Sequence, residues 1–277
     1  MPGPSNAEVS TDWRAHVISP YAWDPDPNQV GLVQGEAGGC FAVSSDFPRR
    51  AYMKPLNAKT DEGGHSRAAR EKIAADLAHD LRLRVPPALL TTRRVAPEGC
   101  TPNLVVSLIL CPVQFSWGTV KGVPSEANPL GAAMAAALTQ CSGLLVFDTW
   151  LAQTDHGDHP ENLIMGYNPD RLYESGMIFL DYANSLGFNG QWAGGAWQPV
   201  QLAAWPPRLL THLDPPAVAA TLDQIERMAE ETIREVVQRI PDAHLPEAEK
   251  PIIIDGLLGR RGLLRPALRT IPGLGGI

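Results

Sequence analysis

The sequence predicts an α+β protein with two lobes, a small β-rich lobe followed by a larger helical one. Short apolar runs typical of strands dominate residues 30–115, and a single amphipathic helical pattern at residues 66–83 interrupts them. Helical patterns, divided by one polar loop, dominate the rest of the chain. Because segregated strands and helices are typical of α+β folds, we expect an irregular arm at residues 1–29, an N-lobe at 30–118 and a C-lobe at 119–277.

The composition favours a globular protein that does not bind nucleic acids in general. Of the 277 residues, 44% are hydrophobic and 19% are charged, which is enough apolar material for a sizeable core. Lys and Arg number 23 against 30 Asp and Glu, so the formal net charge is -7. A general nucleic-acid binder needs a basic surface, which this balance does not provide.

The cysteines and the apolar segments predict a cytoplasmic protein without a membrane partner. Cys40, Cys100, Cys111 and Cys141 are far apart and form no CxxC pair, which argues against a disulfide scaffold or a zinc site. The N-terminus shows no signal-peptide pattern. The uncharged stretch at residues 128–147 is rich in Ala and Gly, and this composition favours a buried core helix over a membrane span.

In the expected N-lobe, VGLVQGEAGGCFAV at residues 30–43 predicts a strand, a Gly-rich turn and a second strand. AYMKP at 51–55 predicts a short strand ended by proline. Residues 66–83 predict a helix, capped by Ser66 and stopped by RVPP, since Ala69, Ile73, Leu77 and Leu81 share one face.

Further strands and helices follow along the chain. PALLTT at 87–92 predicts a strand, and NLVVSLILCPVQF at 103–115 predicts one buried strand that connects the lobes. A helix is expected at 129–152, strands at LIM (163–165) and within MIFLDYANSLGF (177–188), and an amphipathic helix at 217–239.

The residues that could carry chemistry follow one another in an order that suits phosphoryl transfer. Gly35, Gly38 and Gly39 lie in the turn between two predicted strands, Lys54 on the next strand, and Glu71 on the following helix. Glycines let a backbone approach phosphates, a strand lysine neutralises them, and a helix carboxylate can hold that lysine. Each feature is also common in ordinary turns, strands and helix surfaces, so none predicts a site alone.

A polar loop and a later aspartate complete the set. Within eight residues the loop holds acidic, imidazole and amide side chains: Asp155, His156, Asp158, His159, Glu161 and Asn162. Asp181 follows the apolar run MIFL, where a buried carboxylate needs a cation or hydrogen-bond donors. A loop Asp can accept the proton of an attacking hydroxyl, while an Asn and a second Asp can hold Mg²⁺ at the phosphates of ATP.

At these residues the chain resembles the HipA-like kinases, a group of atypical kinases. The resemblance covers about residues 30–190 and rests on AYMKP, EKIAADLAHDLRLRVPP, FDTWLAQTDHGDHPENLIM and FLDYANSLGF. It implies a kinase-like fold that binds ATP and Mg²⁺ between its lobes, with the adenine near residues 108–115 and a protein Ser or Thr hydroxyl as acceptor. It makes Lys54 the phosphate-binding lysine, Glu71 its helix partner, Asp155 the catalytic base, and Asn162 and Asp181 the metal ligands.

Within this resemblance, the spacing leaves two candidates for the catalytic base. Protein kinases place five steps between the catalytic Asp and the Asn, whereas Asp155 lies seven positions and Asp158 four positions before Asn162. Some HipA-like proteins carry the seven-step spacing, which favours Asp155. HGDHPEN also resembles the loop of aminoglycoside and choline phosphotransferases, with one residue missing, which would make Asp158 the base. His159 is a further candidate, and His156 stands where many kinases have Arg.

Other functions fit parts of the same sequence. The irregular loop and the missing Arg are compatible with a pseudokinase that binds nucleotide without turnover, and the acceptor could be a small alcohol in place of a protein. A metal-dependent hydrolase would use His156, Asp158 and His159 with a distant histidine. A protein without enzymatic activity could bind a partner through the region between Trp192 and Trp205.

Overall fold

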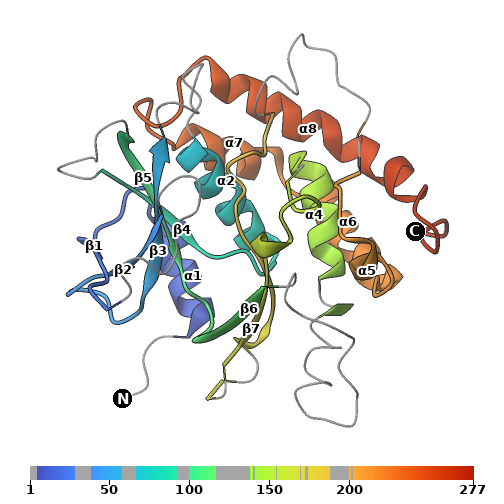
Figure 1. Ribbon diagram of the computed structural model, residues 1–277. Coiled ribbons are helices and arrows are strands. Elements are labelled where there is room, and N and C mark those ends of the chain that lie inside the picture. The colour runs from blue at the N-terminus through green and yellow to red at the C-terminus, as the bar shows by residue number, and fades with distance from the viewer. Residues whose placement is uncertain are drawn as a thin grey trace.

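The structure is a computed structural model of the 277-residue chain. It describes residues 5–28, 39–57, 67–92, 100–116, 138–139, 141–153, 155–168, 170–171, 174–187, 200 and 202–277. Within these residues, none of the helices combines the length and the hydropathy that a membrane crossing requires. The predicted α+β, two-lobed architecture is confirmed, and Figure 1 shows the strands of one lobe beside the helices of the other.

The N-lobe is built on an antiparallel five-stranded sheet. Its strands lie in the order β1-β2-β3-β5-β4. Their bounds are β1 (Asp24–Pro25), β2 (Cys40–Val43), β3 (Ala51–Asn57), β4 (Ala88–Thr92) and β5 (Cys100–Leu108). The predicted strands at 51–55 and 87–92 are confirmed. Strand β3 is central, and its Lys54 lies opposite Val105 of β5.

Helix α2 (Arg67–Asp80) confirms the predicted helix, although its expected cap Ser66 lies outside the described residues. Helix α1 (Asn6–Ala15) contradicts the predicted irregular arm. Ser5 and Glu8 form a capping box that starts α1, and Val9 and Trp13 are buried beneath it. The residues after α1 then cover the edge of β4, since Leu90 exchanges backbone hydrogen bonds with Val17 and Ser19.

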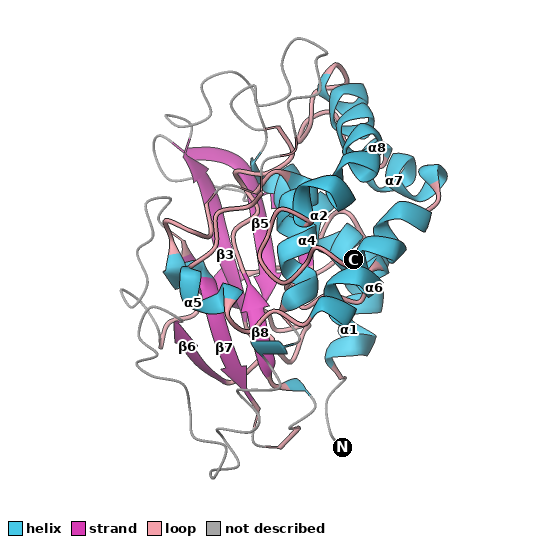
Figure 2. Ribbon diagram, turned by 90° about the vertical axis from the view of Figure 1, so that its right-hand side faces the viewer, coloured by secondary structure: helices cyan, strands magenta, loops and turns pink. Residues whose placement is uncertain are grey.

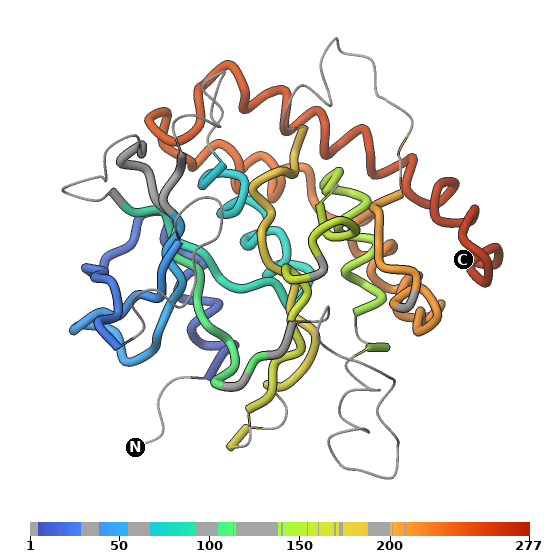
Figure 3. The backbone as a smooth tube through the Cα atoms, in the orientation of Figure 1, coloured from blue at the N-terminus to red at the C-terminus, as the bar shows by residue number. Residues whose placement is uncertain are grey.

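The single strand predicted at residues 103–115 is wrong. Strand β5 ends at Leu108, and the chain then enters a second sheet as β6 (Val113–Ser116). Pro112 precedes β6 and lacks an N–H group, so a continuous ladder cannot pass through it. Strand β6 pairs with β7 (Leu163–Tyr167), which pairs with β8 (Gly176–Phe179). Residues 163–187 thereby run between the two lobes (Figure 3).

The helices of the C-lobe, apart from the short one at Pro207–Leu210, gather with α2 on one side of the sheets (Figure 2). They are α4 (Ser142–Leu151), α5 (Pro207–Leu210), α6 (Pro215–Arg227), α7 (Glu230–Gln238) and α8 (Glu249–Leu268). The helix predicted at 217–239 is in fact two, because Met228 and Ala229 have extended backbone between α6 and α7. Helix α8 has no counterpart in the sequence prediction.

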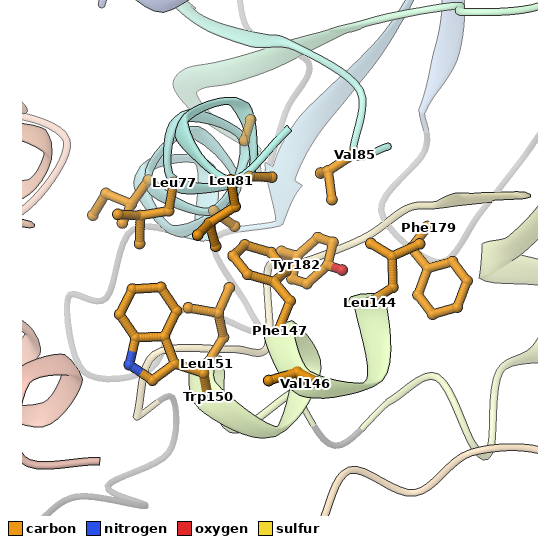
Figure 4. Packing of buried hydrophobic residues seen from close by; sticks show 14 of the residues in the cluster. Leu77, Leu81, Val85, Leu144, Val146, Phe147, Trp150, Leu151, Phe179 and Tyr182 are labelled. Atoms are coloured by element: carbon orange, nitrogen blue, oxygen red, sulfur yellow. The ribbon is translucent and has the colours of Figure 1, made fainter. Parts of the chain in front are cut away.

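The core decides which face of the N-lobe sheet carries the candidate site. Met53 and Val106 pack with α1 on one face, whereas Val105 packs with α2 and the C-lobe helices on the other. Because neighbouring residues of a strand face opposite sides, Lys54 faces α2. Figure 4 shows Tyr182 between the side chains of α2 and α4, so the segment after β8 reaches the same core.

Candidate active site

Three residues that are distant in the sequence meet at Lys54. Its Nζ donates to Glu71 Oε1 at 2.8 Å and contacts Asp181 Oδ1 at 3.0 Å. The Lys54 side chain is 20% exposed, the Glu71 side chain 7% and the Asp181 side chain 30%. The three residues that were predicted to lie on a strand, on a helix and after a strand therefore share one half-buried site. Among them, the Asp181 side chain is the most exposed to solvent.

The secondary structure explains why these side chains converge. Lys54 extends from the middle of β3 toward α2, and Glu71 lies on the second turn of that helix. Asp181 directly follows Leu180 at the end of β8, and the backbone of Tyr182 also hydrogen-bonds to Glu71. The helix, the sheet and the turn after β8 are thus tied together by the same carboxylate.

Electrostatics keeps the lysine charged in this site. Burial opposes the charged form of Lys54, but the two carboxylates outweigh it and raise the pKa of the lysine. Burial raises the pKa of Glu71 in spite of Lys54. For Asp181, burial is outweighed by Lys54, which holds the pKa of this carboxyl below its ordinary value. With both carboxylates ionised, the cluster carries one excess negative charge, which favours binding of a further cation.

Asp181 adopts a backbone conformation that is rare outside glycine. Its φ is 63°, in the left-handed region that Asp tolerates better than most residues. Gln153 Nε2 donates to the Asp181 carbonyl oxygen, and the Ala183 backbone hydrogen-bonds to the Asp181 carboxylate. The surrounding chain therefore holds the turn that directs this carboxylate at Lys54.

Asn162 lies beside this turn. It ends the short 3₁₀ helix Pro160–Asn162, and its carbonyl oxygen accepts a hydrogen bond from the Leu180 backbone at 2.9 Å. Since Leu163 pairs with Phe179 in the antiparallel β7–β8 ladder, Asn162 and Asp181 leave adjacent strand ends. No group of three or more His, Cys, Asp or Glu side chains suited to a metal lies among the described residues. Mg²⁺ needs few protein ligands, and these two oxygen-bearing side chains suit it.

The two candidate bases have different surroundings. Asp155 is 20% exposed, and its Oδ2 accepts a hydrogen bond from Asn184 Nδ2 at 3.2 Å. Because Asn184 follows Asp181 by three positions, this bond joins Asp155 to the turn that carries Asp181. Asp158 is exposed. The described contacts thus link Asp155 to the turn that carries Asp181.

His159 lies on the outer side of the same loop. Its side chain is 47% exposed, with Nδ1 2.8 Å from Glu161 Oε1 and Nε2 3.5 Å from Asp155 Oδ1. His159 therefore lies between Asp155 and Glu161 on the outer side of this loop.

Of the three glycines, only Gly39 falls among the described residues, and Gly35 and Gly38 lie outside them. A Cβ on Gly39 would collide with the ring of Tyr52. Tyr52 shares a strand face with Lys54, two positions away, so Gly39 lies over the face that carries the candidate site. The Tyr52 ring would have to shift to make room for a larger residue at this position.

The sequence did not reveal the role of Asp148, which is fully buried in α4. Its carboxylate accepts hydrogen bonds from His156 Nδ1 at 2.7 Å, the Tyr182 hydroxyl at 2.7 Å and Trp205 Nε1 at 2.8 Å. The other ring nitrogen of His156 lies 2.7 Å from the Leu180 carbonyl oxygen. In the sequence, only the position of one acidic residue within an apolar helical run indicates that Asp148 is buried and needs hydrogen-bond donors.

These contacts change the interpretation of His156. It was expected as a possible substitute for the kinase Arg or as a metal ligand, but its side chain is 0% exposed and both ring nitrogens have protein partners. His156 therefore joins α4 to the strand end before Asp181.

The His156–Asp148 pair predicts a dependence of stability on pH. Burial opposes protonation, but Asp148 outweighs it and raises the pKa of His156 above its ordinary value of 6.5. The pair should therefore stabilise the fold fully below pH 6.5, and this contribution should be lost as the pH rises through the raised pKa. We expect the difference in melting temperature between wild type and His156→Gln to be largest at acidic pH and to shrink at alkaline pH. A difference that grows with pH would contradict the assignment.

The link between the lobes occupies the region expected to hold the adenine. Asn6 Nδ2 donates to the Leu110 carbonyl oxygen, and Gln114 Nε2 donates to that of Cys111, both at 3.1 Å. The Ile109 backbone N–H donates to the Arg50 carbonyl oxygen. An adenine bound at this link would therefore use backbone groups other than these three.

The fold matches that of a solved kinase. The crystal structure of the proinflammatory kinase CtkA of Helicobacter pylori aligns with 92% of this chain and 97% of its own, with a TM-score of 0.59 and 14% sequence identity. No protein-family model matches the sequence, and no curated protein matches it. At this identity the likeness concerns the fold alone, so the chain has a two-lobed, kinase-like fold.

Proposed function

We propose that the protein is a phosphotransferase that uses ATP and Mg²⁺ to phosphorylate a hydroxyl group. The observation that carries this proposal is the position of Lys54 Nζ, 2.8 Å from Glu71 and 3.0 Å from Asp181. A lysine held by a helix carboxylate, next to an acidic turn, is the arrangement with which protein kinases hold the phosphates of ATP. The kinase-like fold supports the same proposal.

In this proposal each residue has a defined task. Lys54 exchanges its contact with Asp181 for a phosphate oxygen, while Glu71 keeps the ammonium group in place. Asn162 and Asp181 would hold Mg²⁺, which neutralises phosphate charge when bound. Asp155 accepts the proton of the attacking hydroxyl. Most of the rate acceleration then comes from positioning and from charge neutralisation.

A protein Ser or Thr is the proposed acceptor, with a small alcohol as the alternative. The polar loop that resembles the HipA-like kinases supports the first, and HGDHPEN supports the second. A metal-dependent hydrolase loses support, because both nitrogens of His156 are already bonded within the protein.

The test is Mg²⁺-dependent use of ATP by the purified protein. We expect calorimetry to detect ATP binding that requires Mg²⁺, and we expect γ-labelled ATP to label the protein itself or an added protein substrate. Binding without hydrolysis, autophosphorylation or transfer would identify a pseudokinase. Absence of binding at millimolar ATP would contradict the proposal.

Substitution of the two loop aspartates separates the candidate bases. We expect Asp155→Asn to lower kcat by about 10²–10⁴-fold, because a positioned general base contributes about that much. Asp158→Asn should leave kcat within about twofold of wild type, since Asp158 is exposed. The reverse pattern, measured on folded variants at saturating ATP, would assign the base to Asp158.

A further inference from the structure

Consecutive residues of α2 contact two different parts of the molecule. Glu71 holds Lys54, whereas the next side chain, Lys72, is fully buried and contacts α1. Successive residues of an α-helix are turned by about 100°, so the two side chains reach separate neighbours. The position of Glu71 thus depends on what fixes the other side of α2.

The C-terminus of α1 supplies that fixation. Lys72 Nζ donates to the Trp13 carbonyl oxygen at 2.8 Å, and Arg239 Nη2 donates to the Arg14 carbonyl oxygen at 2.6 Å. The last carbonyl groups of a helix lack partners within the helix and form the negative end of its dipole. One cation from α2 and one from the end of α7 therefore cap α1.

Asp76 of α2 joins the two cations. Its Oδ1 accepts from Lys72 Nζ at 2.8 Å, and its Oδ2 accepts from Arg239 Nη2. Lys72 and Asp76 are 0% and 2% exposed. A buried network that pairs opposite charges in this way restricts the helices to one arrangement.

Three contacts nearer the surface extend this network, two of them to α2 and one to α7. Arg14 Nη2 lies 3.2 Å from Asp80 Oδ2 and Nη1 3.7 Å from Glu235 Oε1, while Ser10 Oγ lies 2.9 Å from His79 Nδ1. Helix α1 is thus attached to α2 over more than one turn.

We propose, on the basis of the proposed function, that α1 is a positioning element of the active site and that Lys72 is the positioning residue. The last turn of α1 holds Lys72 and Arg239, and these contacts keep α2 where Glu71 reaches Lys54. Release of α1 would let α2 shift as a rigid body. A displacement of about 1 Å in a group that orients phosphates is enough to lower the rate strongly.

The first test is the activity of Lys72→Met, which removes the ammonium group and keeps an unbranched apolar side chain. We expect kcat to fall by about 10- to 100-fold in the folded variant, with a smaller change in KM for ATP. Lys250→Met is the matched control, because Lys250 is also a buried lysine paired with two carboxylates, those of Asp242 and Glu247, in the C-lobe. The control should keep the wild-type kcat.

The second test needs no nucleotide. A double-mutant cycle of Lys54→Met and Glu71→Gln, read as unfolding free energy, gives the coupling between the two side chains. We expect most of this coupling to be lost in the Lys72→Met background and retained in the Lys250→Met background. If wild type shows no ATP turnover, the proposed function fails, and this cycle still decides the role of α1.

Unchanged kcat together with unchanged coupling in folded Lys72→Met would overturn the proposal. If Lys72→Met does not fold, Arg14→Met replaces it, because the Arg14 side chain is 14% exposed and connects α1 to Asp80. For Arg14→Met we expect kcat and the Lys54–Glu71 coupling to fall, by less than is expected for Lys72→Met. Wild-type values of both quantities in Arg14→Met would overturn the proposal.

Discussion

Lys54→Met should lower phosphotransfer at least about a hundredfold while the chain stays folded. Lys54 is the positive charge at the point where Glu71 and Asp181 converge. Removal of one preorganised charge that stabilises a transition state costs about 10²–10³-fold in kcat. Methionine keeps most of the buried length of the side chain, and Glu71, whose pKa burial already raises, can be neutralised by a proton. Steady-state kinetics at saturating ATP is the measurement.

The control for this prediction is Arg227→Met, which removes a cation from the exposed surface of α6. The Arg227 side chain is 80% exposed and pairs only weakly with the neighbouring Asp223 at 3.2 Å. The Arg227→Met substitution should leave both kcat and the fold unchanged. A folded Lys54→Met variant with wild-type turnover would remove Lys54 from the active site and would contradict the proposed function.

Asp148→Asn should destabilise the protein by about 3–5 kcal/mol, because it breaks a buried ion pair from one side. The three groups that donate to Asp148 belong to His156, Tyr182 and Trp205, which are 0%, 0% and 6% exposed. An amide has one acceptor oxygen and brings two new donors into a site already filled with donors. Urea unfolding at pH 6, where His156 is protonated, is the measurement.

The matched control is Asp158→Asn in the neighbouring loop. Asp158 is exposed, so its loss of charge should change the free energy of unfolding by no more than about 0.5 kcal/mol. An Asp148→Asn variant as stable as Asp158→Asn would show that the buried carboxylate does not stabilise the loop that carries His156. The pH dependence expected for His156 should then disappear as well.

Local patterns in the sequence were sufficient for the elements that carry Lys54, Glu71 and Asp181. Strand β3 and helix α2 have unambiguous patterns, and Asp181 follows a strongly apolar strand. What the sequence could not provide was their contact, which depends on how β3, α2 and the turn after β8 pack. The roles of these residues in phosphotransfer stay predictions.

The missed elements have identifiable physical causes. Helix α1 follows a segment rich in Pro. Its capping box at Ser5 and Glu8 lies among other polar residues, so the sequence pattern does not distinguish the start of a helix from an irregular arm. Helix α8 contains Pro266 and several glycines, which lower its intrinsic helix propensity. Its buried residues Ile253, Leu257 and Leu264 share one face, so tertiary packing stabilises a helix that propensity alone does not predict.

The Asp148 centre was beyond the reach of local pattern. Its donors come from the polar loop at residues 155–162, the turn after β8 and the segment before α5, which are separated by up to 57 residues from Asp148. Only the fold brings them to one carboxylate. The position of Asp155 beside Asn184 likewise depends on a contact between residues 29 positions apart.

A structure of the protein with Mg²⁺ and a non-hydrolysable ATP analogue tests the convergence on Lys54 most directly. The expected result is Lys54 Nζ within hydrogen-bond distance of a phosphate oxygen, the metal ion on Asn162 and Asp181, and Asp155 facing the γ-phosphate. A nucleotide bound elsewhere, or one bound between the lobes without contact to Lys54 and Asp181, would contradict the proposed active site.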